Sequence, residues 1–170
     1  MSRPDLNRVP EFYHGYINKA KEDDLMTALK NCTTELMILL SNIPEEKQNY
    51  RYAEGKWTIK EVIQHLIDAE RVFTYRALRF ARKDTAPLPG FNENLFADNS
   101  KASTRNWEDL VNEFSSLRKA TEALFASFDE EQLEAEGVSN SHPIYVLGIG
   151  FICAGHVNHH CDIIKERYLK

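Results

Sequence analysis

The sequence predicts an all-α protein built as a four-helix bundle. Four segments place apolar residues at alternating three- and four-residue steps, which is the spacing of one face of an α-helix. No convincing strand pattern, internal repeat or low-complexity tract lies between them. Because 170 residues suffice for a domain with its own core, we expect residues 1–170 to form a single bundle domain.

The first helix is expected from about Tyr16 to Asn42, after a lead-in over residues 1–15 that lies across the surface. Pro44 ends it, because proline cannot continue a helix. Its apolar stripe comprises Leu25, Leu29, Cys32, Leu36, Leu39 or Leu40, and Ile43.

The second helix has the clearest start, because Thr58-Ile59-Lys60-Glu61 reads as a capping box. The Thr58 hydroxyl accepts from the Glu61 amide, and the Glu61 carboxylate reaches back to the cap. We expect the helix to end near Lys83. For Trp57, just before the cap, we prefer a hydrophobic plug to a substrate contact. The inward face comprises Val62, Leu66, Ala69, Val72, Phe73 and Phe80.

A long connection, Asp84 to Arg105, separates the second and third helices. Loops beyond about 12–15 residues without structure of their own are uncommon and often functional. Fully extended, it reaches roughly 70 Å, enough to cross over and make these two helices parallel. Two roles remain open for Phe91, Asn94 and Phe96: covering a pocket, or sealing the end of the bundle.

The third helix follows an Asn106 cap, and the fourth runs from Pro143 to near Leu169. Pro143 suits the first turn, where its missing amide is harmless. Between them, Asp129 to His142 is polar and is expected to form a short helical turn and a loop. The inward face of the third helix comprises Leu110, Phe114, Leu117, Thr121, Leu124 and Phe128.

Composition narrows the class of protein. A net charge of −5 without clustered Lys and Arg argues against nucleic-acid binding. Three cysteines without a C-x-x-C pair indicate a reducing cytoplasm and not a disulfide framework. The first residues lack the apolar core of a signal peptide, and no run approaches the ~18 apolar residues of a membrane span. We therefore expect a cytoplasmic protein without membrane contact.

The fourth helix carries three histidines within Gly155–His160. At about 100° per residue, His156 and His160 straddle the core-facing direction, whereas His159 lies near its edge. This i, i+4 spacing lets two imidazoles share one metal ion. We expect Gly155, on the flank of this face, to allow close approach of a neighbouring helix.

His65 on the second helix is the expected third ligand. It borders the apolar arc of its helix and lies seven residues after Thr58, while His160 lies nine before Leu169. If the two helices are antiparallel neighbours, His65 and His160 lie at the same height along the bundle axis. The alternative is that the histidines are partly exposed or satisfied by carboxylates, because burying unpartnered imidazoles is costly.

A set of three neutral imidazoles is typical of a catalytic metal site with open positions. Such a cation lowers the pKa of water or stabilises a thiolate or oxyanion. Ligand type favours Zn or Ni, with Fe, Mn and Co left open.

Other polar side chains carry weaker predictions, and none identifies a catalytic residue. Asp68 and Glu61 are read as a solvated acidic face, or as a partner of His65 or a general base. Arg76 is predicted to point inward, to meet a substrate anion or a carboxylate. His14 and His142 are expected to be surface or capping groups. A Cys-His nucleophile is disfavoured, with Cys153 read as a small core residue and Cys161 as a helix flank.

Taken together, these segments resemble the DinB-like (DinB/YfiT) superfamily. The resemblance is carried by Tyr52–Leu66, Asp68–Arg71, Tyr75–Arg82 and Pro87–Phe91, and by Ala154–His160 with Glu166–Leu169. It implies an up-down-down-up four-helix bundle, frequently a dimer, with a metal held by His65, His156 and His160. Members include S-transferases that use bacillithiol or mycothiol and a thiol-dependent maleylpyruvate isomerase. Many others are named as metal-dependent hydrolases without a known reaction.

Two classes of function follow. The first is a divalent-metal-dependent enzyme acting on a small molecule, either a thiol S-transferase, in which the metal activates a low-molecular-weight thiol, or a hydrolase, in which it activates water. The second is a non-catalytic bundle that binds a metal, a small ligand or a partner helix. By the resemblance, we expect a homodimer.

Overall fold

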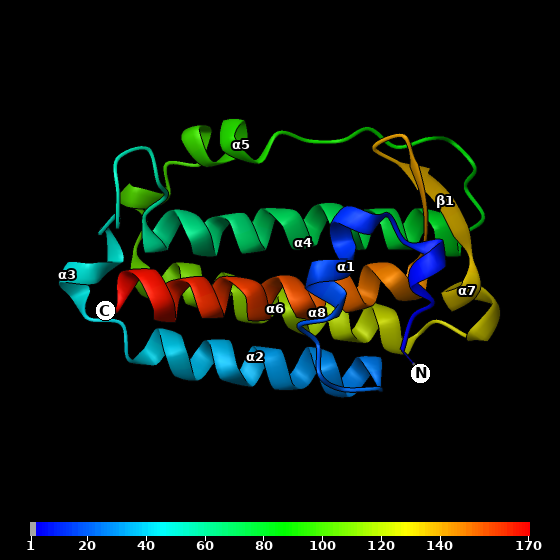
Figure 1. Cartoon of the computed structure of the whole chain (residues 1–170), viewed down its shortest axis with the longest axis horizontal. Helices are drawn as coiled ribbons and strands as arrows, with labels where there is room; N and C mark the ends of the chain where they lie inside the picture. Colours follow the sequence, from blue (N-terminus) through cyan, green and yellow to red (C-terminus); the bar gives the residue numbers. More distant parts are fainter. Residues whose placement is uncertain (1–2) are drawn as a thin grey trace.

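Four long helices pack side by side in the computed structural model, which describes residues 3–170 (Figure 1). They are α2 (Leu25–Ser41), α4 (Ile59–Ala81), α6 (Trp107–Ala126) and α8 (Val146–Ile163). Helices α2 and α8 run in one direction and α4 and α6 in the other, so the predicted up-down-down-up bundle is confirmed. Within the described part of the chain, no helix is both long and apolar enough to span a membrane.

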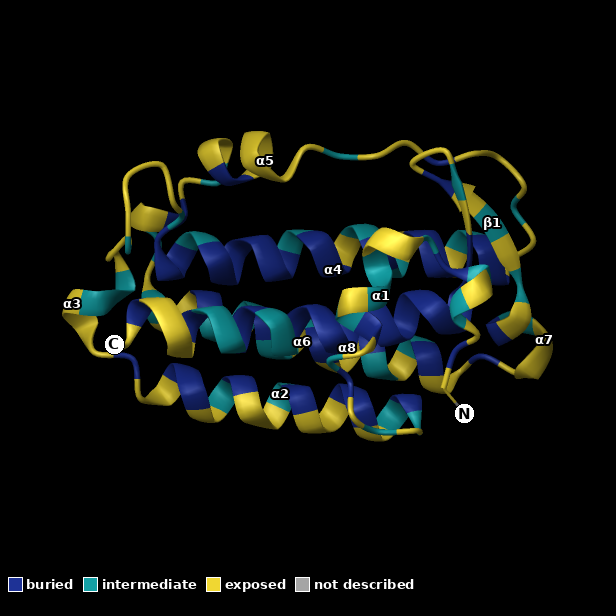
Figure 2. Ribbon diagram, in the orientation of Figure 1, coloured by how far each residue is buried: buried dark blue, intermediate teal, exposed yellow. Residues whose placement is uncertain are grey.

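Helix α8 lies at the centre of the fold. It packs against α1, α2 and α4, and it is buried around most of its circumference (Figure 2). The sequence explains this position, because no Asp, Glu, Lys or Arg occurs between Val146 and Cys161. A single π-helical segment, η3 (Ile164–Tyr168), extends α8 to the end predicted for the fourth helix.

The predicted helix starts are confirmed where a side chain caps the first turn. The Thr58 hydroxyl accepts from the Glu61 amide at 3.1 Å, and the Glu61 carboxylate accepts from the Thr58 amide at 2.7 Å. Asn106 caps α6 by accepting from the Asp109 amide. The apolar stripe predicted for the first helix is buried throughout.

The predicted start of the first helix at Tyr16 is wrong. The chain instead forms the 3-10 turn η1 (Leu6–Arg8) and the short helix α1 (Glu11–Ile17), and α2 begins only at Leu25. Asp24 starts α2, because its carboxylate accepts from the Thr27 amide. The lead-in is therefore partly helical, and α1 packs on α8.

A β-hairpin replaces the predicted loop before the fourth helix. Strand β1 (Glu136–Ser139) pairs antiparallel with β2 (His142–Tyr145). Asn140 and Ser141 both have positive φ, as a two-residue hairpin turn of this hand requires. Pro143 thus lies in a strand, and α8 starts at Val146 and not at Pro143.

The remaining polar segments form short helices. They are α3 (Glu45–Gln48) after the first long helix and α7 (Glu130–Glu134) before the hairpin. On α6, Leu117 and Leu124 are only half-buried, and the buried face also includes Arg118 and Phe125.

The connection between α4 and α6 crosses the whole length of α4 (Figure 1). It contains α5 (Glu93–Asn99) and the 3-10 turn η2 (Ala102–Thr104). Leu88 fastens its first part to the hairpin, because its amide donates to the Val138 carbonyl and its carbonyl accepts from the Asn140 amide. At the far end, the Lys60 ammonium donates to the Arg105 carbonyl at 2.8 Å. This crossover therefore has a fixed path above α4.

Candidate metal centre

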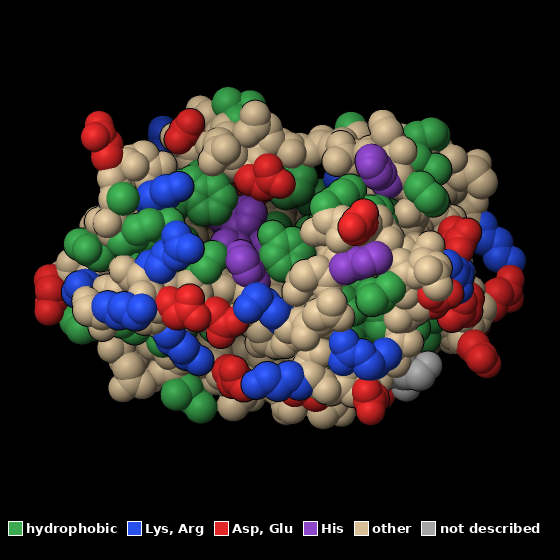
Figure 3. Space-filling view, viewed as in Figure 1, with side chains coloured by type: hydrophobic (Ala, Val, Ile, Leu, Met, Phe, Trp, Pro, Cys, Tyr) green, Lys and Arg blue, Asp and Glu red, His purple; other side chains and the backbone are tan. Residues whose placement is uncertain are grey.

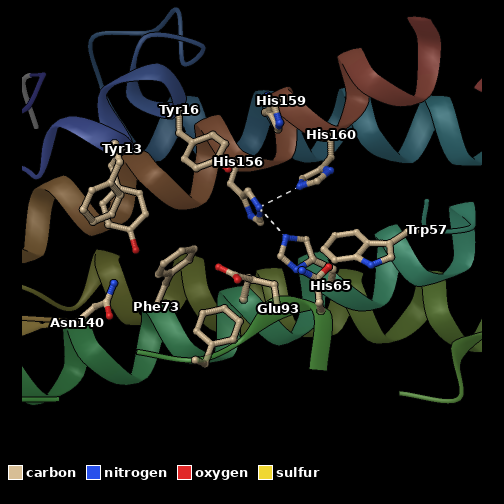
Figure 4. A pocket seen from close by; sticks show the side chains of 14 residues that line it. Tyr13, Tyr16, Trp57, His65, Phe73, Glu93, Asn140, His156, His159 and His160 are labelled. Carbon is tan, nitrogen blue, oxygen red and sulfur yellow. Dashed lines mark hydrogen bonds between the residues drawn. The ribbon is translucent and has the colours of Figure 1, made fainter. Parts of the chain in front are cut away.

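Three histidines from two helices converge in the interior of the bundle (Figure 4). His65 comes from α4, and His156 and His160 come from successive turns of α8. The His156 Nε2 atom lies 3.0 Å from the His65 Nε2 atom and 3.1 Å from the His160 Nε2 atom. Because α4 and α8 run antiparallel, the levels inferred from Thr58 and Leu169 do coincide.

All three side chains are buried, whereas His159 is half-buried and outside the cluster. Burial lowers the pKa of His65 to about 4, and it lowers the pKa values of His156 and His160 well below the ordinary value. The three imidazoles are therefore neutral near pH 7, and each presents a free lone pair.

Hydrogen bonding alone does not satisfy the cluster. The His156 Nε2 atom lies close to the Nε2 atoms of both His65 and His160. A ring nitrogen carries either one proton or one lone pair, so it forms one good hydrogen bond and not two. The Nδ1 atom of His160 is buried, without a hydrogen-bond partner in residues 3–170. Packing against the rings of His65, His156 and His159 orients His160 instead.

The same arrangement fits a metal ion. Two ligand atoms about 2.0–2.1 Å from one ion, at octahedral or tetrahedral angles, lie about 2.8–3.4 Å apart. The two closest Nε2 separations fall in this range, and one ligand nitrogen from each histidine lies within 4.8 Å of the others. Neutral imidazoles are also the preferred nitrogen ligands of transition metals.

Aromatic rings hold the histidines in place. Trp57 packs on His65 with ring centroids 4.7 Å apart, and Tyr16 packs edge-on against His156 at 5.1 Å. Trp57 packs against the core just before the capping box, and it also contacts the histidine cluster and lines the cavity beside it.

Gly155 explains how Tyr16 reaches this position. A Cβ atom at Gly155 would lie 1.8 Å from the Tyr16 carbonyl oxygen, so only glycine allows α1 to approach α8 this closely. The predicted close approach at Gly155 is thus present, made by the short helix α1 and not by a bundle helix.

A cavity of about 540 Å³ opens beside the three histidines. In the space-filling view, histidine side chains are visible at the bottom of a hollow between apolar groups (Figure 3). The crossover lines one side with Phe91, Glu93 and Asn94, so this segment does shape a pocket. Phe96 packs on Phe91 and does not line the cavity. The six aromatic side chains in its wall are Phe12, Tyr13, Tyr16, Trp57, Phe73 and Phe91.

Arg76 is buried, as its inward prediction requires, but it lies behind the pocket wall. Its guanidinium donates to the Pro89 carbonyl at 2.8 Å and lies near the rings of Phe73 and Phe91. No carboxylate in residues 3–170 forms an ion pair with it. Arg76 thereby holds the crossover against α4, and its contact with a substrate stays a prediction.

The two predicted acidic candidates on α4 have other partners. Glu61 caps its helix and pairs with Arg51, and the Asp68 carboxylate accepts from the side-chain Nε2 of Gln64. Neither is hydrogen-bonded to a histidine of the cluster in the described structure.

The surface or capping role predicted for His14 and His142 is only partly found, because His14 lies within α1, His142 lies in β2, and both are half-buried. His14 bonds through Nε2 with the Leu6 and Val9 carbonyls and closes the lead-in. His142 packs against Phe12. All three cysteines are buried, including Cys161 on the helix flank.

Sequence reasoning missed Phe12, Tyr13, Tyr16, Glu93 and Asn140 as pocket residues. Three of them belong to α1, which was read as an irregular lead-in up to residue 15. The density of aromatic residues from Phe12 to Tyr16 is the signal that could have identified them. For Glu93 and Asn140 we see no local signal, because their positions depend on the path of the crossover and the hairpin.

Comparison with known proteins shows which sequences this chain resembles. The sequence pattern of the DinB superfamily matches residues 28–164. A protein of Geobacillus kaustophilus (strain HTA426) named "Putative metal-dependent hydrolase" is 27% identical over 79% of this chain and 77% of its own length. Another of that name, from Geobacillus thermodenitrificans (strain NG80-2), is 24% identical over 72% and 71%.

Two solved structures share the fold. YfiT from Bacillus subtilis, described as "a probable metal-dependent hydrolase with an unusual four-helix bundle topology", superposes with a TM-score of 0.75 and 17% identity, over 84% of this chain and 82% of that one. A mycothiol-dependent maleylpyruvate isomerase superposes with a TM-score of 0.68 and 15% identity, over 81% of this chain. The present chain covers 57% of that isomerase.

Proposed function

The chain belongs to the DinB superfamily, and we propose that it is a metal-dependent enzyme in which His65, His156 and His160 hold a divalent cation. The observation that carries the proposal is the convergence of three buried, neutral imidazoles beside an open cavity. Three nitrogen ligands leave open positions on the ion, and this donor set favours Zn or Ni.

The reaction follows from what such an ion supplies when bound, which is Lewis acidity that generates a hydroxide or thiolate nucleophile near neutral pH. The protein's own part is to keep the three imidazoles neutral and to shape an apolar chamber. We favour hydrolysis, because the curated relatives with the higher sequence identity are named as metal-dependent hydrolases. The structural likeness to a mycothiol-dependent isomerase supports transfer to a low-molecular-weight thiol as the second candidate.

Metal analysis of untagged protein tests the proposal. We expect stoichiometric metal in the wild type and a strong loss in His65→Ala, His156→Ala and His160→Ala. His159→Ala is the matched control, because it removes a neighbouring imidazole from the same cavity, and we expect it to retain the metal. Wild-type protein that takes up no Zn, Ni, Fe, Mn or Co in stoichiometric amount would contradict the proposal and favour a non-catalytic ligand-binding bundle.

Metal-loaded protein then separates the two reactions. One assay supplies bacillithiol, mycothiol or another small thiol together with an electrophile and follows loss of the thiol. The other supplies a panel of esters and amides and follows the release of acid. Turnover in the second assay alone, lost in His156→Ala, is the outcome we expect.

A further inference from the structure

The cavity beside the histidines has an unusual charge pattern. Among the described side chains that line it, Glu93 is the one carboxylate. No Lys or Arg lines the cavity; the buried Arg76 donates to the Pro89 carbonyl and interacts with the side chain of Tyr13, which belongs to the wall.

Glu93 stands on the wall opposite α8. It is the first residue of α5 in the crossover, and its carboxylate is directed into the space between Phe73 and His65 (Figure 4). Glu93 is an exposed residue, and its carboxylate makes no hydrogen bond or ion pair within residues 3–170. It does not join the three-histidine ligand set.

The Tyr13 phenol, which lines the cavity, is influenced by both Arg76 and Glu93. Burial raises the pKa of Tyr13, the positive charge of Arg76 acts to lower it, and the negative charge of Glu93 makes a smaller contribution that raises it.

The rest of the wall suits an apolar or cationic body. Six aromatic side chains line the cavity. Aromatic ring faces carry negative potential and attract organic cations by about 0.5–2 kcal/mol each in favourable geometry. A carboxylate among aromatic rings is thus complementary to a positively charged group and opposes an anionic one.

From this juxtaposition we propose that the cavity selects substrates that carry a protonated amine on an aromatic or aliphatic body, with the ammonium group at Glu93. The inference rests on the proposed function for the reaction at the metal, and it adds the class of substrate. Any cation held by the three histidines adds positive charge at the α8 wall. The substrate ammonium is therefore placed at the crossover wall, and the bond to be attacked faces α8.

Three small probes of similar size test the inference: benzylamine, benzyl alcohol and phenylacetate. Binding is measured by NMR titration of metal-free protein at pH 7, because an amine nitrogen could otherwise coordinate the metal directly. We expect benzylamine to bind about tenfold more tightly than benzyl alcohol, and phenylacetate to bind most weakly. Benzyltrimethylammonium, which cannot coordinate a metal, should retain the preference in metal-loaded protein.

The variant Glu93→Gln should lower the affinity for benzylamine to that for benzyl alcohol and leave the alcohol unaffected. Asp98→Asn is the matched control, because it removes the same charge from the same helix without touching the cavity. Equal losses in both variants, or phenylacetate binding as tightly as benzylamine, would overturn the inference.

Metal content measured on the same samples keeps the two proposals separate. Stoichiometric metal without an amine preference defeats the substrate class alone. An amine preference without metal defeats the metalloenzyme and leaves the cationic-ligand site standing.

Discussion

Gly155→Ala perturbs the contact on which the wall of the cavity depends. An added Cβ atom would lie 1.8 Å from the Tyr16 carbonyl oxygen and 2.5 Å from its carbon, so α1 must retreat by roughly 1.6 Å to restore an ordinary contact. Overpacking of this kind costs about 1–3 kcal/mol. Here we expect the upper end, because the obstructing atoms are backbone and not the end of a flexible side chain.

Helix propensity works in the opposite direction, since alanine favours a helix over glycine by about 0.8–1.0 kcal/mol. The net effect expected is a loss of about 2 kcal/mol in the free energy of unfolding, which for a chain of this size lowers Tm by about 4–8 °C. The displacement should also weaken the packing of Tyr16 on His156, so amide exchange in α1 should become faster.

The matched control is Gly150→Ala on the same helix. Its Cβ atom would meet only side-chain atoms, of Leu25 and Phe125 at 2.6–3.0 Å, which can shift. We expect a net change within about 1 kcal/mol of zero. A Gly155→Ala protein that is more stable than the wild type, with unchanged exchange in α1, would refute the reasoning.

Three further outcomes follow from local contacts. Thr58→Ala removes the capping box of α4 and should lower the free energy of unfolding, measured by urea titration, by about 1 kcal/mol. The control Thr34→Ala, on the exposed face of α2, should change it by less than about 0.5 kcal/mol. Arg76→Met should loosen the crossover, seen as faster amide exchange in α5, while the bundle helices keep their protection. Unchanged exchange would mean that the hydrogen bonds of Leu88 and Lys60 fasten the crossover without Arg76. Burial raises the pKa of the Cys32 and Cys153 thiols, so both stay protonated at pH 8. Iodoacetamide should therefore label them only after unfolding. Rapid labelling of the native protein would show that α2 and α8 open.

The bundle was predictable because its signals are local and long. The α2 stripe repeats over five turns, and the α4 start is marked by a capping box at Thr58. The hairpin was not predictable from such patterns. Its strands have four residues each, and Gly137 is placed by the Phe80 ring, which a Cβ atom would meet at 2.1 Å. That contact exists only once α4 and the hairpin are together.

In the candidate site, likewise, the histidines were predictable and the opposite wall of the cavity was not. The direction of His156 and His160 follows from the helical repeat, and the level of His65 follows from helix lengths. The opposite wall depends on the crossover, whose path is set by the Leu88 and Arg76 hydrogen bonds. Because neither bond has a sequence signature, Glu93 could not be recognised as a cavity residue in advance.

A buried ion pair on α4 and α6 also escaped prediction. The Arg118 guanidinium donates to the Glu70 carboxylate at 2.7 Å, and the Thr121 hydroxyl donates to the other carboxylate oxygen at 2.6 Å. Arg118 further contacts the Cys32 sulfur of α2 and the Cys153 carbonyl of α8, both at 3.4 Å. This polar layer therefore joins all four bundle helices.

The charges of this layer depend on each other. Burial acts to lower the pKa of Arg118, but the Glu70 carboxylate holds it above its ordinary value. Removing one partner leaves the other charge buried and unpaired, which costs about 3–5 kcal/mol. We expect such a loss for Glu70→Leu and for Arg118→Met, measured by urea unfolding.

The double variant Glu70→Leu with Arg118→Met decides what the layer contributes. Replacing a buried pair with apolar side chains is frequently neutral or stabilising, so we expect the double variant to recover most of the loss. If it recovers the stability but loses sharp, cooperative unfolding, then the pair serves to fix the register of the four helices. That register sets the common level of His65 and His160, so the metal content of the double variant should fall with the loss of cooperativity. Additive losses in the double variant would instead show that the two side chains stabilise the bundle independently.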